Sequence, residues 1–323
     1  MTSSHPPDAT LADAGEFGAI AAFTALFAQS SAVVVGPGDD AAVVRVPGDV
    51  LVSTDVLVEG RHFRRDWATA EDVGRRAAAQ SLSDLNAMGG TTTAVTVGLV
   101  APADLPLSWA QGLAAGLAEE CDLVGSSVVG GDLTRGDVLV VSVTAIGHAG
   151  GAPVLRSGAR PGDVVALVGR QGWAAAGLAV LSRGFRSPRA VVEAYRRPEV
   201  PYDAGPEALL AGATAMVDVS DGLLADLGHV ARASGVVVDL TSAALPVAEP
   251  LQAVGAATGT DPLTFVLAGG DDHPLTATFP SASAVPDGWT VIGSVSEPGP
   301  DAEAGTVTVD GSAYDGEQGW RHF

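Results

Sequence analysis

The sequence contains no lysine, because all 17 basic residues of the 323-residue chain are arginines. A phosphate-binding loop that depends on a lysine is therefore excluded. Abundant alanine, glycine, valine and arginine without lysine is the composition that GC-rich coding DNA produces, so the absence is weak as a functional clue. It still sets a chemical constraint. If this chain handles phosphate, metal ions held by acidic side chains must neutralise most of the charge.

Cysteine is almost absent. The single residue, Cys121, excludes an internal disulfide and a cysteine-rich zinc site. It falls in a helical pattern, which predicts a buried structural thiol. The chain also lacks the His-Glu-x-x-His, Gly-x-Ser-x-Gly and Cys-x-x-Cys motifs. His148, His229 and His273 are isolated in the sequence, so zinc-dependent hydrolysis and serine-esterase chemistry lack support.

Positive charge and long apolar runs are scarce as well. The net charge of −21 and the pI near 4.4 argue against bulk electrostatic binding to nucleic acid or to an anionic membrane. No apolar run reaches the roughly 18 residues that suggest a membrane-spanning helix, and no secretory signal pattern opens the chain. We therefore expect a cytoplasmic protein without a nucleic-acid or membrane partner.

Helix and strand patterns alternate along the chain. Apolar spacing predicts helices over 16–29, 72–88, 109–121 and 174–182, and another that begins near residue 220. Strands are expected over 32–35, 42–46, 50–54, 93–100, 127–130, 139–147, 163–168, 235–240, 276–279, 291–295 and 306–309, with one more ending at residue 218. Glycine, proline and arginine concentrate between residues 147 and 162, so we place domains at 1–150 and 151–323. Each should be an α/β (α+β) unit with a mixed or antiparallel sheet packed with helices, not part of one parallel doubly wound sheet.

Six short acidic segments carry the candidate chemistry. Each sets an aspartate beside glycine, serine or threonine at the edge of an apolar stretch, and we interpret them mainly as turns: 38–41, 53–55, 82–85, 130–132, 218–222 and 269–272. Magnesium prefers oxygen ligands, usually carboxylates together with phosphate and water. One such segment is ordinary turn or capping chemistry. Six in one chain favour a site that holds several magnesium ions and a phosphate.

Two aspartates stand out by their positions. Asp84 falls on the same face of the predicted 72–88 helix as Val73 and Ala77, where an unpaired carboxylate is costly. Asp218 ends a strand just before a helix. Ser220 or Asp221 could cap that helix, which leaves Asp218 as the better ligand candidate.

These segments, taken in order, closely resemble the thiamine-monophosphate kinase family across residues 16–323. The matching stretches are GDDAAV (38–43), VSTDVLVEGRHF (52–63), SLSDLNAMG (81–89), GGDLTRG (130–136), LRSGARPGD (155–163), VDVSDGL (217–223) and GWRHF (319–323). The resemblance implies the two-domain fold of the aminoimidazole ribonucleotide synthetase superfamily and a homodimer whose N-terminal sheets join across a two-fold axis. It also implies an enzyme that converts ATP and thiamine monophosphate into ADP and thiamine diphosphate by direct in-line transfer with several magnesium ions.

The resemblance further implies roles for individual positions. The implied magnesium ligands are Asp40, Ser53, Thr54, Asp55, Asp84, Asp132, Asp218 and Asp221. The implied nucleotide contacts are Gly131, Asp132, Arg156 and Ser220, and the implied substrate contacts are His62, Asp271 and Trp320. No catalytic general base is expected, because a phosphate nucleophile is already ionised near neutral pH.

The chain departs from the family pattern in two places. The family typically reads Gly-Gly-Glu-Asp-Tyr-Glu-Leu where this chain has GGDDHPL (269–275). Asp271 is thus one methylene shorter than the expected glutamate, and His273 and Pro274 replace Tyr-Glu. The aromatic residue expected near adenine is not evident, since Trp109 or Ala110 occupies that stretch.

Two other functions remain open on the sequence. One is another ATP-dependent enzyme of the same superfamily, of the aminoimidazole ribonucleotide synthetase kind. The other is a non-catalytic protein that binds magnesium and nucleotide. Selenophosphate synthetase and the hydrogenase-maturation protein would need a terminal cysteine, and Cys121 satisfies neither.

Overall fold

A computed structural model of the chain describes residues 6, 8–300 and 302–320. Residues 321–323, the end of the GWRHF segment, lie outside these ranges. The chain divides into two compact units, one formed by residues 1–85 and 91–148 and the other by residues 86–90 and 149–323. The main division at residue 148 lies beside the boundary expected at 150, although the short segment 86–90 groups with the second unit. No helix in the described ranges is both long and apolar enough to cross a membrane.

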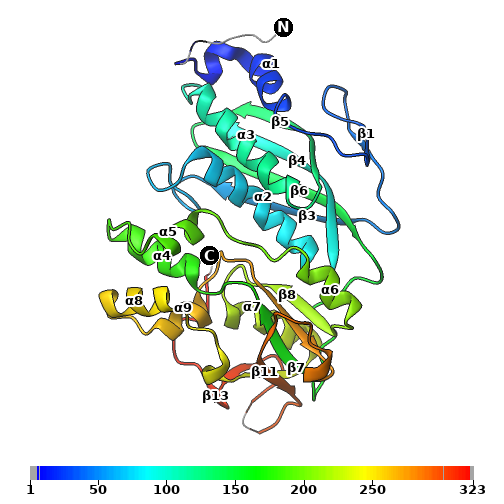
Figure 1. The fold of residues 1–323 in the computed structure, drawn as a ribbon, viewed down its shortest axis with the longest axis vertical. Helices are drawn as coiled ribbons and strands as arrows, with labels where there is room; N and C mark the ends of the chain where they lie inside the picture. Colours follow the sequence, from blue (N-terminus) through cyan, green and yellow to red (C-terminus); the bar gives the residue numbers. More distant parts are fainter. Residues whose placement is uncertain (1–5, 7, 301, 321–323) are drawn as a thin grey trace. The chain divides into compact units, whose positions relative to one another are not determined.

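The first unit is built around a sheet with strand order β3-β6-β4-β5. Its elements are α1 (Leu11–Thr24), β1 (Val33–Val35), β2 (Val43–Val44), β3 (Leu51–Val58), α2 (Ala70–Asn86), β4 (Gly90–Ala101), α3 (Leu107–Asp122), β5 (Ser127–Arg135) and β6 (Val140–Ala149). Strands β3 and β6 are antiparallel, and β4 and β5 are parallel. Helices α2 and α3 lie together over one face of this sheet (Figure 1).

Burial along β3 follows the strand alternation. Leu51 and Leu57 are buried, whereas the intervening Val52 and Val56 are 63% and 47% exposed. Successive side chains of a strand point to opposite faces, so one face of β3 packs inward and the other presents valines to solvent.

Two acidic segments of the first unit are not the turns that we expected. Residues 53–55 lie in the middle of β3, and residues 130–132 lie inside β5. The sheet extends both strands beyond the sequence prediction because pairing with β6 and β4 continues through these polar residues. Glycine and aspartate weaken strand propensity only modestly, and tertiary pairing overrides it here.

The second unit contains a larger sheet with strand order β13-β12-β9-β11-β7-β10-β8. Its strands are β7 (Val164–Val168), β8 (Ala215–Asp218), β9 (Val237–Leu240), β10 (Leu275–Phe279), β11 (Thr290–Ser296), β12 (Val307–Val309) and β13 (Ser312–Ala313). Neighbours are antiparallel, except that β12 runs parallel to β9. This mixed arrangement agrees with the predicted sheet type.

The helices of the second unit are α4 (Trp173–Ser182), α5 (Arg189–Arg196), α6 (Ala204–Leu210), α7 (Leu223–Ser234), α8 (Glu249–Thr258) and α9 (Pro262–Ala268). Sequence patterns missed α5, α6, α8 and α9. Helices α4, α5, α8 and α9 pack together, and α7 packs against β8, β9 and β12 (Figure 1).

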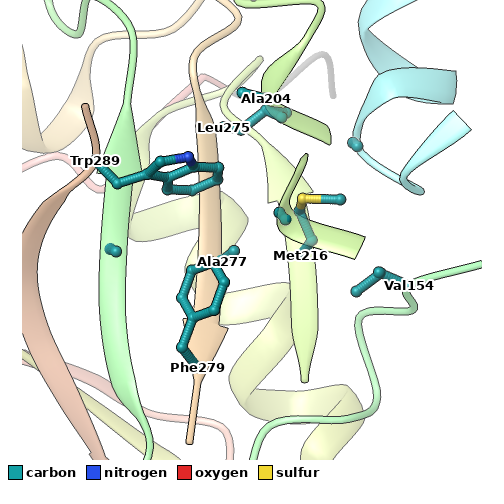
Figure 2. Packing of buried hydrophobic residues seen from close by; sticks show 10 residues of the cluster. Val154, Ala204, Met216, Leu275, Ala277, Phe279 and Trp289 are labelled. Atoms are coloured by element: carbon teal, nitrogen blue, oxygen red, sulfur yellow. The ribbon is translucent and has the colours of Figure 1, made fainter. Parts of the chain in front are cut away.

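The core of the second unit centres on β10, whose residues are all buried. Figure 2 shows Phe279 and Trp289 packed beside Leu275, Ala277 and Met216. The rings of Phe279 and Trp289 meet edge to face, with centroids 5.6 Å apart and planes at 83°. This arrangement is favoured by the aromatic quadrupoles, and it anchors the strand that leads away from the acidic loop at 269–274.

Candidate active site

In the first unit, α2 and the inward face of β3 bring two carboxylates and two hydroxyls together. The Ser53 hydroxyl donates a short hydrogen bond to the Asp84 carboxylate. The Ser81 hydroxyl lies 3.0 Å from Asp55 Oδ2 and 2.9 Å from the carbonyl oxygen of Val143. The helix therefore does carry Asp84 toward the sheet, on the same side as the buried Val73, which lies about three turns earlier in α2. Hydroxyl and carboxylate oxygens are the donor set that magnesium prefers.

Thr54 lies apart from this group. It is exposed on β3 between the less exposed Ser53 and Asp55, and its hydroxyl is 2.8 Å from that of Thr144 on the neighbouring strand β6. Strand alternation places its side chain on the opposite face from Ser53 and Asp55.

A cavity of about 820 Å³ lies elsewhere in the first unit. Its wall is largely apolar and comes from α1, α3, β4, β5 and the β1–β2 segment, with Phe17, Ala110 and Val129 among the lining residues. Asp40 and Asp132 also line it, together with Gly131. A volume of this size is typical of pockets that enclose small-molecule ligands, and a few polar groups in an apolar wall fix a ligand's orientation.

The two acidic groups of the first unit lie at opposite edges of its sheet. Asp55 is on β3 and Asp132 is on β5, with β6 and β4 between them. Three interstrand spacings correspond to about 14 Å. Among the residues that the structure describes, no three His, Cys, Asp or Glu side chains are arranged to hold one metal ion. The first unit thus brings the predicted ligands into two separate groups.

His62 follows β3 and is fixed by a backbone contact. The Val58 N–H donates to His62 Nδ1 at 2.9 Å. Because Nδ1 accepts, the neutral ring carries its proton on Nε2.

In the second unit, two acidic loops are joined through their backbones. The Asp271 N–H donates to the Ser220 carbonyl at 2.9 Å, and the His273 N–H donates to the Val219 carbonyl at 3.2 Å. In return, the Val219 N–H donates to the Pro274 carbonyl at 2.9 Å. Segments 218–222 and 269–274, which are far apart in the sequence, therefore form one structural element.

Close backbone approach requires glycine at two positions of this element. A Cβ atom on Gly270 would lie 2.1 Å from the Ser220 carbonyl oxygen. Gly222 has φ +138°, and a Cβ atom there would lie 2.7 Å from the Ala268 carbonyl oxygen. The glycines of both acidic motifs thus serve the packing of the loops against their neighbours.

Neither Ser220 nor Asp221 caps helix α7, although the sequence left that role open for both residues. Helix α7 begins at Leu223, and its N-cap Gly222 provides no side chain. Asp226 Oδ2 accepts the N–H groups of Ser220, Asp221 and Gly222 at 3.0, 2.9 and 3.0 Å. Burial raises the pKa of Asp226 to about 7, while the backbone N–H groups act in the opposite direction. The capping role that the sequence left open is therefore absent, and Asp226 bonds these three amides instead.

Asp218 is buried and lies 3.1 Å from His273 Nδ1, which is also buried. His273 and Asp271 adopt φ of 54° and 68°, in the left-handed region that non-glycine residues rarely occupy. Such strain persists only where the surroundings enforce it, and it gathers at functional sites. His273, which had seemed isolated in the sequence, is thus a direct neighbour of the best ligand candidate.

Between these two strained residues, Asp272 is buried and accepts the Ala174 N–H at 2.8 Å. Burial raises the pKa of its carboxyl group to about 7. We assign no separate role to Asp272 or Asp226 from the sequence alone. Their position inside or next to an acidic motif was the only available signal.

Trp320 and Arg156 complete the predicted set in the second unit. The Trp320 N–H donates to the Asp221 carbonyl at 2.8 Å, which attaches the end of the described chain to the acidic loop, and its side chain is 61% exposed. Arg156 is exposed, and its carbonyl accepts the Ser234 hydroxyl at 2.9 Å. Partial burial, followed by the charges of Arg156 and Arg232, lowers the pKa of His229. Arg156 therefore lies within electrostatic range of α7.

Comparison with known proteins identifies the family. Residues 38–149 match the model of the AIR synthase related protein N-terminal domain, and residues 160–271 match that of the C-terminal domain. A thiamine-monophosphate kinase of Mycobacterium tuberculosis is 47% identical over 317 residues, covering 97% of this chain and 93% of that protein. The chain belongs to the thiamine-monophosphate kinase family. A member of this family from Corynebacterium glutamicum is 38% identical and covers 100% of both chains.

Solved structures of thiamine-monophosphate kinases agree with that family. One of them, described as "AaThiL complexed with AMPPCP and TMP", has a TM-score of 0.79 and 30% sequence identity, and it covers 96% of this chain and 98% of its own. The predicted two-domain fold of the aminoimidazole ribonucleotide synthetase superfamily is therefore confirmed.

Within this thiamine-monophosphate kinase fold, the structure groups most of the predicted residues in three places, which do not include Thr54, His62 and Arg156. Ser53, Asp55 and Asp84 lie between β3 and α2. Asp40, Gly131 and Asp132 line the cavity. The joined loops of the second unit collect the remaining group, which consists of Asp218, Ser220, Asp221, Asp271 and Trp320.

Cys121 is not part of any of these groups. It is buried in α3, and burial raises the pKa of its thiol to about 12. The prediction of a buried structural thiol is confirmed, since a thiol in this state is a poor nucleophile.

Proposed function

We propose that this chain transfers the γ-phosphoryl group of ATP to thiamine monophosphate, giving thiamine diphosphate and ADP. The observation that carries the proposal is the match to curated thiamine-monophosphate kinases over 97% or more of the chain. A solved neighbour at 30% identity was obtained with AMPPCP and TMP. ATP and thiamine monophosphate are thus the expected small-molecule partners.

The 820 Å³ cavity is the best candidate for the adenosine part of ATP. Its apolar wall suits a flat base, and Ala110, not Trp109, is among its lining residues. Gly131 and Asp132 in the same lining would contact the nucleotide. Arg156 and Ser220 are proposed as nucleotide contacts on the family resemblance alone. The forked guanidinium of Arg156 suits phosphate oxygens.

The donor chemistry of the acidic groups fits magnesium. Asp55 and Asp84 lie beside the hydroxyls of Ser81 and Ser53, and both of these carboxylates are only partly buried. In the first unit the proposed ligands are Asp40, Ser53, Asp55, Asp84 and Asp132, and in the second unit they are Asp218 and Asp221. Thr54 would contribute only its carbonyl oxygen, because its hydroxyl bonds to Thr144.

Bound magnesium would screen the repulsion between the two phosphates and stabilise the charge that develops on transfer. The chain's own residues would position the reactants for in-line attack by a phosphate oxygen of the substrate. That nucleophile is already ionised, so no side chain has to remove a proton.

Three residues are proposed to contact thiamine monophosphate. Trp320 offers an exposed aromatic face for a flat cationic ring. His62 and Asp271 would provide polar contacts. Asp271 replaces the glutamate expected in the family, so its contact would be longer or pass through a water molecule.

A homodimer is proposed through the sheet of the first unit. Val52 and Val56 on β3 expose an apolar surface that a second copy would cover. The family resemblance implies that these sheets join across a two-fold axis. The cytoplasmic location stays a prediction from the sequence.

The test is direct. Purified protein incubated with ATP, magnesium and thiamine monophosphate should form thiamine diphosphate and ADP in equal amounts, measured by chromatography. Omission of magnesium or its chelation should abolish the product. Absence of product despite intact ATP binding would reject the kinase and favour the non-catalytic alternative.

A further inference from the structure

The backbone of residues 219–222 has a partner for every polar group. The N–H of Val219 and the carbonyls of Val219 and Ser220 bond to the 269–274 loop. The Asp221 carbonyl accepts the N–H of Trp320, and the Gly222 carbonyl accepts that of Asp226. The three remaining N–H groups, those of Ser220, Asp221 and Gly222, all point to one oxygen of Asp226. The loop is therefore held from both sides, and its side chains are what it offers to a ligand.

We propose that Asp226 is a positioning residue for phosphoryl transfer, because its carboxylate fixes the loop that carries Asp218, Ser220 and Asp221. This inference rests on the proposed function. Asp226 contacts no reacting atom in the proposal. It holds the backbone so that the neighbouring carboxylates keep one arrangement, and a misplacement of about 1 Å in such a group can cost roughly 100-fold in rate.

Ordinary helix capping does not account for this geometry. A cap satisfies the first amides of the helix itself, whereas Ser220 and Asp221 precede α7, which begins at Leu223. Asp226 lies inside the helix and reaches back beyond its start. Its carboxylate organises the strand-to-helix connection more than it stabilises the helix.

The same contacts exclude one mode of phosphate binding at this loop. Successive backbone N–H groups in a turn can bind an anion. The amides of Ser220, Asp221 and Gly222 already bond to Asp226, so these three amides are not available to a phosphate.

The first test measures the loop itself and needs no kinase activity. Hydrogen–deuterium exchange should show slow exchange for the amides of residues 220–222 in the unchanged chain. In Asp226→Ala their exchange should accelerate at least ~10-fold, while the strands of the same unit stay protected. Unchanged protection at 220–222 would overturn the proposal. If Asp226→Ala does not fold, Asp226→Asn, which retains one acceptor oxygen, should give a smaller acceleration at the same amides.

Asp163→Ala is the matched control. Asp163 is also buried in the second unit, and its Oδ2 accepts the Arg160 N–H at 2.9 Å and the Thr214 hydroxyl at 2.6 Å. Thr214 precedes β8, at the opposite end of that strand from Asp218. Loss of Asp163 should therefore destabilise the unit without releasing residues 220–222.

The second test separates positioning from stability. At a temperature where all variants are folded, Asp226→Ala should lower kcat at least ~30-fold and raise the magnesium concentration for half-maximal turnover at least ~10-fold, with Asp226→Asn intermediate. Asp163→Ala should change neither by more than ~3-fold. Equal effects of the two alanine variants would overturn the positioning role. Magnesium-dependent binding of AMPPCP, measured by calorimetry, should weaken in the same order of variants. If the unchanged chain makes no thiamine diphosphate, the proposed function is rejected. The binding measurement still tests the positioning role of Asp226 in that case.

Discussion

The two units hold their candidate residues in different ways. In the first unit, Asp55, Asp84 and Asp132 project from regular elements, and side-chain hydrogen bonds such as that from Ser53 to Asp84 help to fix them. In the second unit, the acidic residues lie in two loops whose backbones are bonded to each other. The first arrangement depends on side chains, and the second depends on backbone geometry.

This difference predicts different sensitivity to mutation. A side-chain change in the first unit should alter chemistry and leave the fold intact, because the sheet and helices do not depend on it. A backbone change in the second unit should disturb fold and chemistry together, since the same contacts serve both. The following substitutions are designed to break or refine that contrast.

Asp84→Asn should give the largest effect on turnover. The amide retains an oxygen that can accept the Ser53 hydroxyl but loses the charge proposed to bind magnesium. We expect kcat to fall at least ~100-fold, as for the loss of a group that stabilises transition-state charge, with an unchanged melting temperature. Asp122→Asn, at an exposed acid at the end of α3, is the control and should retain full turnover. Near-normal turnover of Asp84→Asn would remove Asp84 from the metal ligands.

Gly270→Ala should disturb fold and activity together. The new Cβ would approach the Ser220 carbonyl oxygen to 2.1 Å, so the two loops would have to separate. Such overpacking costs about 1–3 kcal/mol, and turnover should fall with it. Gly299→Ala, where no atom lies within 4 Å of the new Cβ, is the matched control. Urea unfolding and steady-state kinetics on both variants provide the measurement. A Gly270→Ala protein with unchanged stability would contradict the close packing of residues 269–274 against residues 218–222.

This difference between the two units also explains which parts of the candidate site could be predicted from the sequence. Asp84 was identified from its place on an apolar helix face, because helical periodicity is a local property. The backbone hydrogen bonds between residues 218–222 and 269–274 could not be predicted, because they join loops some 50 residues apart. They use backbone N–H and carbonyl groups, which do not depend on the side chains. Asp226 was missed for the same reason, as its three acceptor contacts depend on how the chain turns into α7.

Strand lengths were underestimated where polar residues enter a sheet. The polar residues Ser53 and Asp55 led us to predict the end of a strand there. In the structure, β3 continues to Val58 because β6 pairs with its whole length. As a result, the alternation of faces that separates Thr54 from its neighbours was not anticipated. The adenine contact was likewise unassigned, because the cavity wall combines residues from α1, α3, β4 and β5.

Asp272 offers a pH-dependent test of the second unit. Burial raises its folded-state pKa to about 7, well above the ordinary carboxyl value, so the folded protein binds this proton more tightly than the unfolded chain. The stabilisation of the folded state by this bound proton is fully present below about pH 4 and is lost as the pH rises through about 7. Asp272→Asn keeps an acceptor for the Ala174 N–H and cannot ionise.

The stability of Asp272→Asn relative to the unchanged chain should therefore improve between pH 5 and pH 8, by an amount on the order of 1–3 kcal/mol. Denaturant unfolding of both proteins at several pH values gives the difference directly, and other titrating groups cancel in it. A difference that stays constant with pH would mean that Asp272 is ionised throughout this range in the folded protein.

Thr54→Val should give the smallest effect and tests the geometry of β3 most closely. Its hydroxyl bonds to Thr144 on the face opposite Ser53 and Asp55, so its removal should change turnover by less than ~3-fold. Ser53→Ala, one residue earlier on the inward face, removes the partner of Asp84 and should lower turnover ~10-fold or more. Valine is well tolerated in strands, which keeps the comparison free of folding effects. If both variants lost activity equally, both faces of β3 would serve the reaction, and the first unit would depend on more than the side chains that point toward α2.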